Sequence, residues 1–208
     1  MALDFDVPWL THDQIKDKAE EFLNRYHPAK DIPIPIEEIV EFKLGLDIIP
    51  IPGLHEVLNV DGFTYGDRSA IAVEEFIYEK RLARYRFTLA HEAGHLILHP
   101  QAFDFFKPKT INEYKRYVQL LPDHLHGRME FQANSFAGLV LVPTEPLKVE
   151  SEDAIHKIIQ LLPGQPLDPD FAWSVIEEMV SKRFLVSTGT VHRRIEKDRL
   201  RDKFPEFR

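Results

Sequence analysis

Two histidines and a glutamate within five residues form the most chemically suggestive pattern in the sequence. His91 and His95 are separated by three residues, and Glu92 directly follows the first of them. Residues four apart on an α-helix share one face and lie about 6 Å apart along the axis, so two imidazoles there can bind one metal ion. Glu92 flanks the pair and can reach a water molecule on the same metal. This spacing is typical of zinc hydrolases, in which the glutamate acts as general base.

The residues around this motif predict a buried helix that is apolar nearly all round. We expect Thr88 to be its N-cap and Pro100 to end it directly after His99. Two histidines and a glutamate buried without a partner would cost several kcal/mol. A metal site is therefore favoured over the alternative, in which the histidines are buried in the core and only form hydrogen bonds there.

His99 raises an ambiguity, because it lies four residues after His95. Eight residues of helix separate His99 from His91 by roughly 12 Å, so these two cannot share an ion. Only the pair of His91 and His95 has a glutamate between its members, and we expect this pair to bind the metal. His99 is then expected to be a helix-end cation that is stabilised by the C-terminal helix dipole.

A catalytic zinc usually has three protein ligands and one open position, so a third ligand is expected outside the motif. The metzincin extension would require glycine at position 98 and histidine at position 101, where this chain has leucine and glutamine. An acidic residue further along the chain is therefore expected. The acidic candidates are Asp104, Glu113, Asp123, Glu130 and Glu145.

Glu130 is the strongest of these candidates. It begins a second apolar helix that Pro143 ends, and small residues such as Ala133 let this helix approach another one closely. A carboxylate at the head of such a face is costly unless it binds a cation or accepts hydrogen bonds. The alternative is that Glu130 binds no metal and lies in solvent at the start of the helix, where the helix dipole stabilises its negative charge. Asn134, on the same face, is expected to accept a hydrogen bond from a ligand imidazole, that of His91.

These two segments resemble the ImmA/IrrE-type zinc metallopeptidases. Residues 86–99 match the family pattern R-F-T-x-A-H-E-x-G-H-x-x-x-H, and residues 130–137 match E-x-x-A-[ND]-x-F-A. The resemblance extends over residues 35–200. It implies a zinc cofactor bound by His91, His95 and Glu130, with Glu92 as the general base. The chain departs from many relatives at Gln132, where they have glutamate.

Composition limits the other possibilities. With 208 residues and 44% hydrophobic content, the chain is expected to form one core, or a core with a small extension. It contains no cysteine, which excludes disulfides and a cysteine-based zinc site. The start of the chain lacks a basic region followed by an apolar one, and no apolar run approaches about 18 residues. We therefore expect a cytoplasmic protein with no secretory signal and no membrane partner.

The remaining patterns predict an α+β fold with a zincin-like core. We expect helices over residues 12–26 and 36–42 and strands over residues 46–51, 57–60, 62–65 and 70–74. These strands would form a small antiparallel sheet before the active-site helices. In peptidases of this general plan an edge strand pairs with an extended substrate, a role that the resemblance implies here. The core with its N-terminal helices is expected to span residues 1–150.

Residues 151–208 are expected to form a helical extension. After a proline-rich stretch, helices are predicted over residues 171–183 and 188–197, joined like a helix-turn-helix, with Ser187 as the second N-cap. Residues 181–208 have a net charge of +5 in a chain of net charge −8, and Arg193, Arg194 and Lys197 lie on the second helix. DNA binding is conceivable, but simple packing of two helices is the favoured explanation.

Together these features predict a cytosolic zinc endopeptidase. The metal would polarise the scissile carbonyl, and Glu92 would take a proton from water and pass it to the leaving amine. The resemblance implies regulatory proteolysis of a helix-turn-helix repressor. The alternatives are a non-catalytic regulator that binds DNA or a partner and has a structural zinc, and, more weakly, a non-haem iron oxygenase. No oxyanion donor is selected from the five candidates Tyr114, Tyr117, His124, His126 and Arg128.

Overall fold

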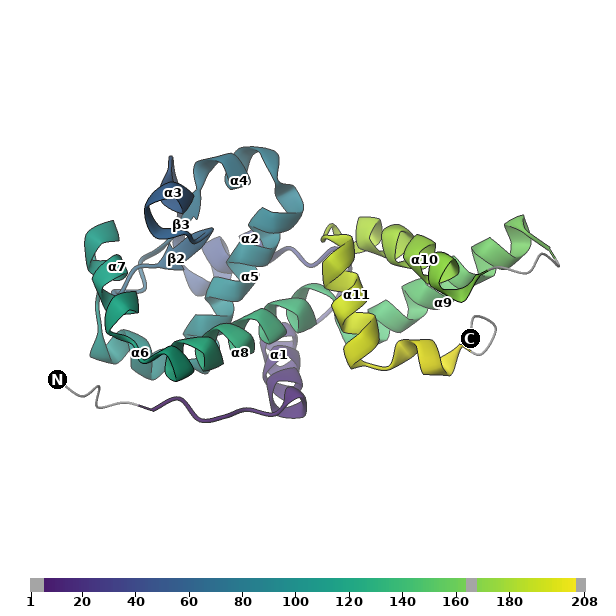
Figure 1. Cartoon of the computed structure of the whole chain (residues 1–208), viewed down its shortest axis with the longest axis horizontal. Coiled ribbons are helices and arrows are strands. Elements are labelled where there is room, and N and C mark those ends of the chain that lie inside the picture. The colour runs from purple at the N-terminus through teal and green to yellow at the C-terminus, as the bar shows by residue number, and fades with distance from the viewer. Residues whose placement is uncertain (1–5, 164–167, 205–208) are drawn as a thin grey trace.

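The computed structural model describes residues 6–163 and 168–204 of the chain, which form mostly helices around one small sheet (Figure 1). Helix α1 (His12–Tyr26) coincides with the first predicted helix and begins at a capping box formed by Thr11 and Gln14. The next predicted helix consists of α2 (Ile36–Glu38) and a π-helical turn, η1 (Ile39–Leu44). It ends at Gly45, whose φ of 70° favours glycine.

The sheet contains three strands, β1 (Asp47–Ile51), β2 (Gly62–Thr64) and β3 (Ala70–Glu74), in the order β1-β3-β2. The predicted α+β class is confirmed. The sheet is mixed, however, because β1 is parallel to β3 and only β2 is antiparallel to it. The antiparallel arrangement that we predicted therefore holds for one of the two pairings. A parallel pair requires a crossover between its strands, and the chain between β1 and β3 provides it.

The strand predicted at residues 57–60 is wrong. This part of the chain belongs to the crossover, where the short helix α3 (Leu54–Leu58) is followed by Asn59. Gly53 and Asn59 have φ values of 72° and 57°, so the backbone is left-handed on both sides of α3. These two positions turn the chain away from an extended path, and β2 starts only at Gly62.

Two long helices form the centre of the molecule. Helix α5 (Leu82–Leu98) follows α4 (Glu75–Lys80), and α8 (Asp123–Leu141) follows α6 (Pro100–Phe105) and α7 (Ile111–Leu120). Helices α5 and α8 pack against each other, as Figure 1 shows. A Cβ atom at Gly94 would lie 3.2 Å from the Cα of Ala133, so small residues on both helices permit the close approach.

Both central helices begin earlier than the sequence predicted. Thr88 is inside α5 and not its N-cap, and its hydroxyl donates a hydrogen bond to the Arg84 carbonyl at 3.0 Å. Glu130 follows Asp123 by seven residues, so it lies in the interior of α8. The alternative that Glu130 is a solvated glutamate at a helix start is therefore wrong.

The C-terminal elements are α9 (Thr144–Leu161), α10 (Pro169–Phe184), α11 (Thr188–Lys197) and the 3-10 turn η2 (Leu200–Lys203). Helix α9 was not predicted, because the prolines at its start suggested a loop. A proline in the first turn removes an N–H that has no helical partner, so it is compatible with a helix start. Residues 164–167 of the predicted proline-rich stretch lie outside the described residues.

The two predicted C-terminal helices are confirmed as α10 and α11, and the Ser187 side chain caps α11 by accepting from the Thr190 backbone N–H. Figure 1 shows α11 beside the C-terminal end of α8. The expected boundary after residue 150 lies inside α9, and one core cluster includes buried residues from both sides of it. In the described parts of the chain, no helix has the length and apolar character needed to cross a membrane.

Candidate metal centre

Three predicted ligand residues come together between α5 and α8. The Nε2 atoms of His91 and His95 are 3.0 Å apart. Glu130 extends from α8, with one carboxylate oxygen 3.4 Å from His91 Nε2 and the other 3.3 Å from His95 Nε2. Ligands at about 2.0–2.1 Å from a tetrahedral zinc ion are separated by about 3.3 Å. The three side chains therefore fit a single ion of this size, and they form a candidate metal site.

The charges of this cluster support cation binding. Burial disfavours the ionised form of Glu130, but the hydrogen bond and charge of His95, with help from His91 and His126, lower its pKa to about 2. Burial and the neighbouring His95 lower the pKa of His91. For His95, burial is outweighed by Glu130 and Glu92, which raise its pKa. The site thus combines an ionised carboxylate with imidazoles that stabilise it.

Asn134 lies one turn after Glu130 on α8, and its side-chain oxygen is 3.2 Å from Nδ1 of His91. An amide oxygen can only accept, so Nδ1 of His91 carries the proton in this contact. The unprotonated Nε2 then points toward Glu130, where a metal would be. The structure thus contains the contact expected from the sequence, while its effect on metal binding stays a prediction.

A second hydrogen-bond chain, which the sequence did not predict, reaches His95. Gln132 donates from Nε2 to the Pro8 carbonyl at 2.8 Å, so its Oε1 faces His99 Nε2, at 2.9 Å. Because this oxygen only accepts, His99 carries its proton on Nε2. His99 Nδ1 is then free to accept from His95 Nδ1 at 3.1 Å. In its neutral form, the one that binds a metal, His95 therefore presents an unprotonated Nε2 to the site, like His91.

His99 is therefore not the helix-end cation that the sequence suggested. Its side chain is fully buried, and burial together with the charge of His95 lowers its pKa to about 3. Gln132 is also fully buried. A neutral His99 acts as a link between Gln132 and His95. The sequence signal for this role is the four-residue spacing of His95 and His99, which places both side chains on one helix face. From the sequence we instead interpreted His99 as a cation at the helix end.

Glu92 is buried beside the three ligand residues, with 5% of its surface exposed. The hydroxyl of Thr64, the last residue of β2, donates a hydrogen bond to Glu92 Oε2 at 2.9 Å. The other carboxylate oxygen has no hydrogen-bond partner among the described residues. This arrangement holds the carboxylate in one orientation and leaves Oε1 available to accept a proton. The sequence gave no signal for Thr64, because only the fold brings β2 next to α5.

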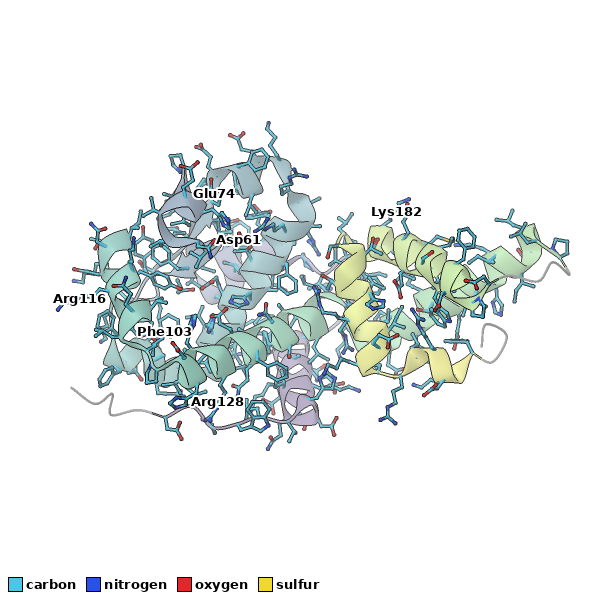
Figure 2. All side chains as sticks on the ribbon, viewed as in Figure 1. Asp61, Glu74, Phe103, Arg116, Arg128 and Lys182 are labelled. Carbon is cyan, nitrogen blue, oxygen red and sulfur yellow. The ribbon has the colours of Figure 1, made fainter. Side chains whose placement is uncertain are left out.

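An open cleft of about 520 Å³ lies over these side chains. His91, Glu92 and Glu130 line it, as does Asp61, which is labelled in Figure 2. Near Glu92 and Glu130 the cleft adjoins a smaller, mainly apolar pocket. Residues that line this pocket away from the polar centre are Phe103 (labelled in Figure 2), Phe106, Leu121 and Met129.

Two of the five candidate oxyanion donors, Tyr114 and His126, line the cleft with the carboxylates. Burial, together with the charges of Glu92 and Glu130, raises the pKa of Tyr114 well above its usual range, so its hydroxyl remains a donor. Its ring stacks on Phe63 of β2 with centroids 4.5 Å apart.

The other candidates have different environments. Arg128 donates to the carbonyl of Val7, and the Tyr117 hydroxyl is buried without a partner among the described residues. His124 is an exposed residue outside the cleft lining.

The two histidines on α5, the carboxylate on α8 and the adjacent buried glutamate define a site of the metallopeptidase type. Residues 44–196 match the IrrE N-terminal-like domain, a peptidase family, and the chain therefore belongs to this family. The resemblance noted from the two sequence motifs is thus confirmed. A comparison with curated proteins found no match.

Proposed function

We propose that this protein is a cytosolic zinc-dependent endopeptidase. His91, His95 and Glu130 bind the zinc ion, and Glu92 is the general base. The observation that carries the proposal is the convergence of two imidazole Nε2 atoms and a carboxylate beside the buried Glu92, in the lining of an open cleft. When bound, zinc supplies a Lewis acid that polarises the scissile carbonyl and activates water.

Glu92 accepts a proton from the attacking water and returns it to the leaving amine. Its Oε2 is held by Thr64, so Oε1 is the proton acceptor. Tyr114, whose hydroxyl remains protonated, donates a hydrogen bond to the oxyanion that develops on the scissile carbonyl. Stacking against Phe63 limits the positions that the Tyr114 ring can adopt. These residues supply the acid–base and electrostatic parts of an amide hydrolysis.

The sheet supports the binding of an extended peptide. In the described part of the chain, β2 pairs with β3 and with no other strand, and Gly62 of β2 lines the cleft. An extended segment can add to such an edge through backbone hydrogen bonds, as in other peptide-binding sheets. The substrate is a regulatory protein of the helix-turn-helix repressor type, as the family resemblance implies.

A structural role for the metal is less well supported. Structural zinc sites normally have four protein ligands and are closed to solvent. Here three candidate ligands are found among the described residues, and the site faces an open cleft. An open coordination position next to a buried carboxylate fits catalysis better.

The proposal is tested with the Glu92→Gln variant of the full chain. Zinc content is measured after loading and desalting, and cleavage is measured on a repressor encoded beside the gene. We expect near-stoichiometric zinc and loss of cleavage, because the amide introduced at this position cannot accept the proton. Glu75→Gln in α4 is the matched control and should behave like the wild type. A Glu92→Gln protein that cleaves at the wild-type rate would refute the proposal.

A further inference from the structure

The cleft beside the candidate metal site continues toward α11 as two grooves. A groove of about 490 Å³ shares Asp61, Arg84 and Phe87 with the cleft. On the opposite side it is lined by Thr190 and Arg193 of α11. A peptide that leaves the cleft past Phe87 therefore reaches the surface of α11.

The second groove, of about 430 Å³, shares Phe87 and Asn134 with the cleft. Thr190 and Arg193 line this groove as well, and Lys197 extends it along the same helix. Because α11 forms a wall of both grooves, we call them together the α11 groove. The α11 groove is thus continuous with the candidate active site.

The α11 groove is basic. Arg193 and Lys197 are four residues apart on the exposed face of α11. The ion pairs found here among the described residues involve their neighbours His192, Arg194 and Arg201, and neither Arg193 nor Lys197. Among the described residues, Asp61 is the carboxylate that lines the groove. The guanidinium of Arg84 already donates hydrogen bonds of 2.5 and 2.7 Å to it. Arg193 and Lys197, together with Arg81, therefore face the groove without such a pairing, in a chain of net charge −8.

Two neighbouring basic residues, Arg194 of α11 and Arg201 of η2, have structural partners. The guanidinium of Arg194 donates to the Val142 carbonyl, at 3.2 Å, and to the carboxylate of Asp198, at 2.7 Å. Arg201 pairs with Glu177 at 3.2 Å. Arg193 and Lys197 differ from these neighbours, because no such contact is found for them in the described part of the chain.

We propose that the α11 groove binds an acidic segment of the substrate polypeptide while the adjoining segment occupies the cleft. This inference rests on the proposed endopeptidase function and adds a substrate class to it: extended chains with aspartate or glutamate on one side of the scissile bond. Complementary charge at Arg193 and Lys197 raises the association rate and selects against basic segments. Phe87, between the cleft and the groove, offers an apolar contact to the connecting residues.

DNA is a less suitable occupant, although α10 and α11 resemble a helix-turn-helix. DNA-binding proteins neutralise several phosphates with lysine and arginine. Here Arg194 is buried in contacts with α8 and Asp198, and His192 bonds Glu177 at 2.9 Å. The two remaining cations of α11, Arg193 and Lys197, line a groove next to the peptidase site, where an extended peptide fits.

The first test measures binding without requiring cleavage. A fluorescein-labelled octapeptide of alternating glutamate and alanine is titrated with the full chain, and fluorescence anisotropy is recorded at low salt. We expect binding that weakens about tenfold or more in Arg193→Glu/Lys197→Glu, because two exposed ion pairs become repulsive. The matched control Lys43→Glu/Lys157→Glu changes the net charge equally at two exposed lysines away from the groove and should bind like the wild type.

The second test examines cleavage. The zinc-loaded protein is incubated with a peptide library prepared from a whole proteome, and the cleaved sites are identified by mass spectrometry. We expect acidic residues to be enriched on one side of the cleaved bond with the wild type and the control variant, and this enrichment to disappear with Arg193→Glu/Lys197→Glu.

These outcomes separate the two proposals. Absence of any cleavage, with acidic-peptide binding that depends on Arg193 and Lys197, would refute the peptidase function but leave the acidic-segment site intact. Failure of the wild type to bind the acidic octapeptide, or equal weakening in the control variant, would overturn the acidic-segment site. Tighter binding of a DNA duplex than of the octapeptide, lost in Arg193→Glu/Lys197→Glu, would assign the groove to nucleic acid instead.

Discussion

Replacing Gln132 tests whether the buried hydrogen-bond chain controls the ligand nitrogen of His95. In Gln132→Leu, the Nε2–H of His99 loses its acceptor in a fully buried site, which costs about 1–3 kcal/mol of folding free energy. The Pro8 carbonyl also loses its donor, but Pro8 is exposed, so water can replace the amide at little cost. A moderate loss of stability is therefore expected in the metal-free protein.

The decisive effect is on metal affinity. Without Gln132, His99 can relieve the unpaired N–H by moving its proton to Nδ1, where it faces His95 Nδ1. His95 must then carry its proton on Nε2, which opposes metal binding. Loss of a partner that orients a ligand typically weakens metal affinity about 10- to 100-fold, or about 1.4–2.7 kcal/mol. We expect zinc affinity of Gln132→Leu to fall within this range.

Gln132→Glu separates this effect from simple packing. A carboxylate still accepts from His99 Nε2 and preserves the tautomer of His95, but it cannot donate to the Pro8 carbonyl. Zinc affinity should therefore remain at the wild-type level or become tighter. Ser181→Ala removes a buried hydroxyl in α10 that donates to the Glu178 carbonyl, and it controls for stability loss far from the site.

The assay is a competition titration of zinc against a chromogenic chelator, combined with urea unfolding of the metal-free proteins. The hydrogen-bond chain predicts that Gln132→Leu loses zinc affinity and that Gln132→Glu retains it. Wild-type zinc affinity in Gln132→Leu would refute the reasoning. Equal loss in both variants would show that Gln132 acts through packing alone.

Three further predictions concern α5 and α8. Glu130→Ala should lose most of its zinc affinity in the same competition titration, because it removes one of three ligands, and retention of full affinity would place the third ligand elsewhere. Asn134→Ala should weaken zinc binding about 10- to 100-fold, whereas Asn134→Asp should preserve or tighten it. Wild-type zinc affinity in Asn134→Ala would contradict the role assigned to this contact. Gly94→Val should destabilise the protein in urea unfolding by about 1–3 kcal/mol, since its side chain would collide with Ala133 and Phe136, and wild-type stability would show that the helices can separate.

Much of the candidate site could be predicted because it depends on the period of a helix. Backbone hydrogen bonds between residues four apart place His91 and His95 on one face of α5 wherever that helix packs. The same period places Asn134 one turn after Glu130 on α8. The small residues on these faces indicated that the two helices could approach each other closely, and the structure shows this approach at Gly94.

Only the tertiary structure decided which distant segments meet. Thr64 reaches Glu92 across 28 positions of sequence, and Gln132 connects Pro8 to His99. Such contacts depend on how helices and strands pack, and no local period or cap encodes them. The parallel pairing of β1 with β3 was missed for the same reason, since strand direction in a sheet is set by the crossover and by burial. The sequence by itself therefore determined the candidate ligands and the base, whereas packing decided the side chains that orient them and the groove that leads to α11.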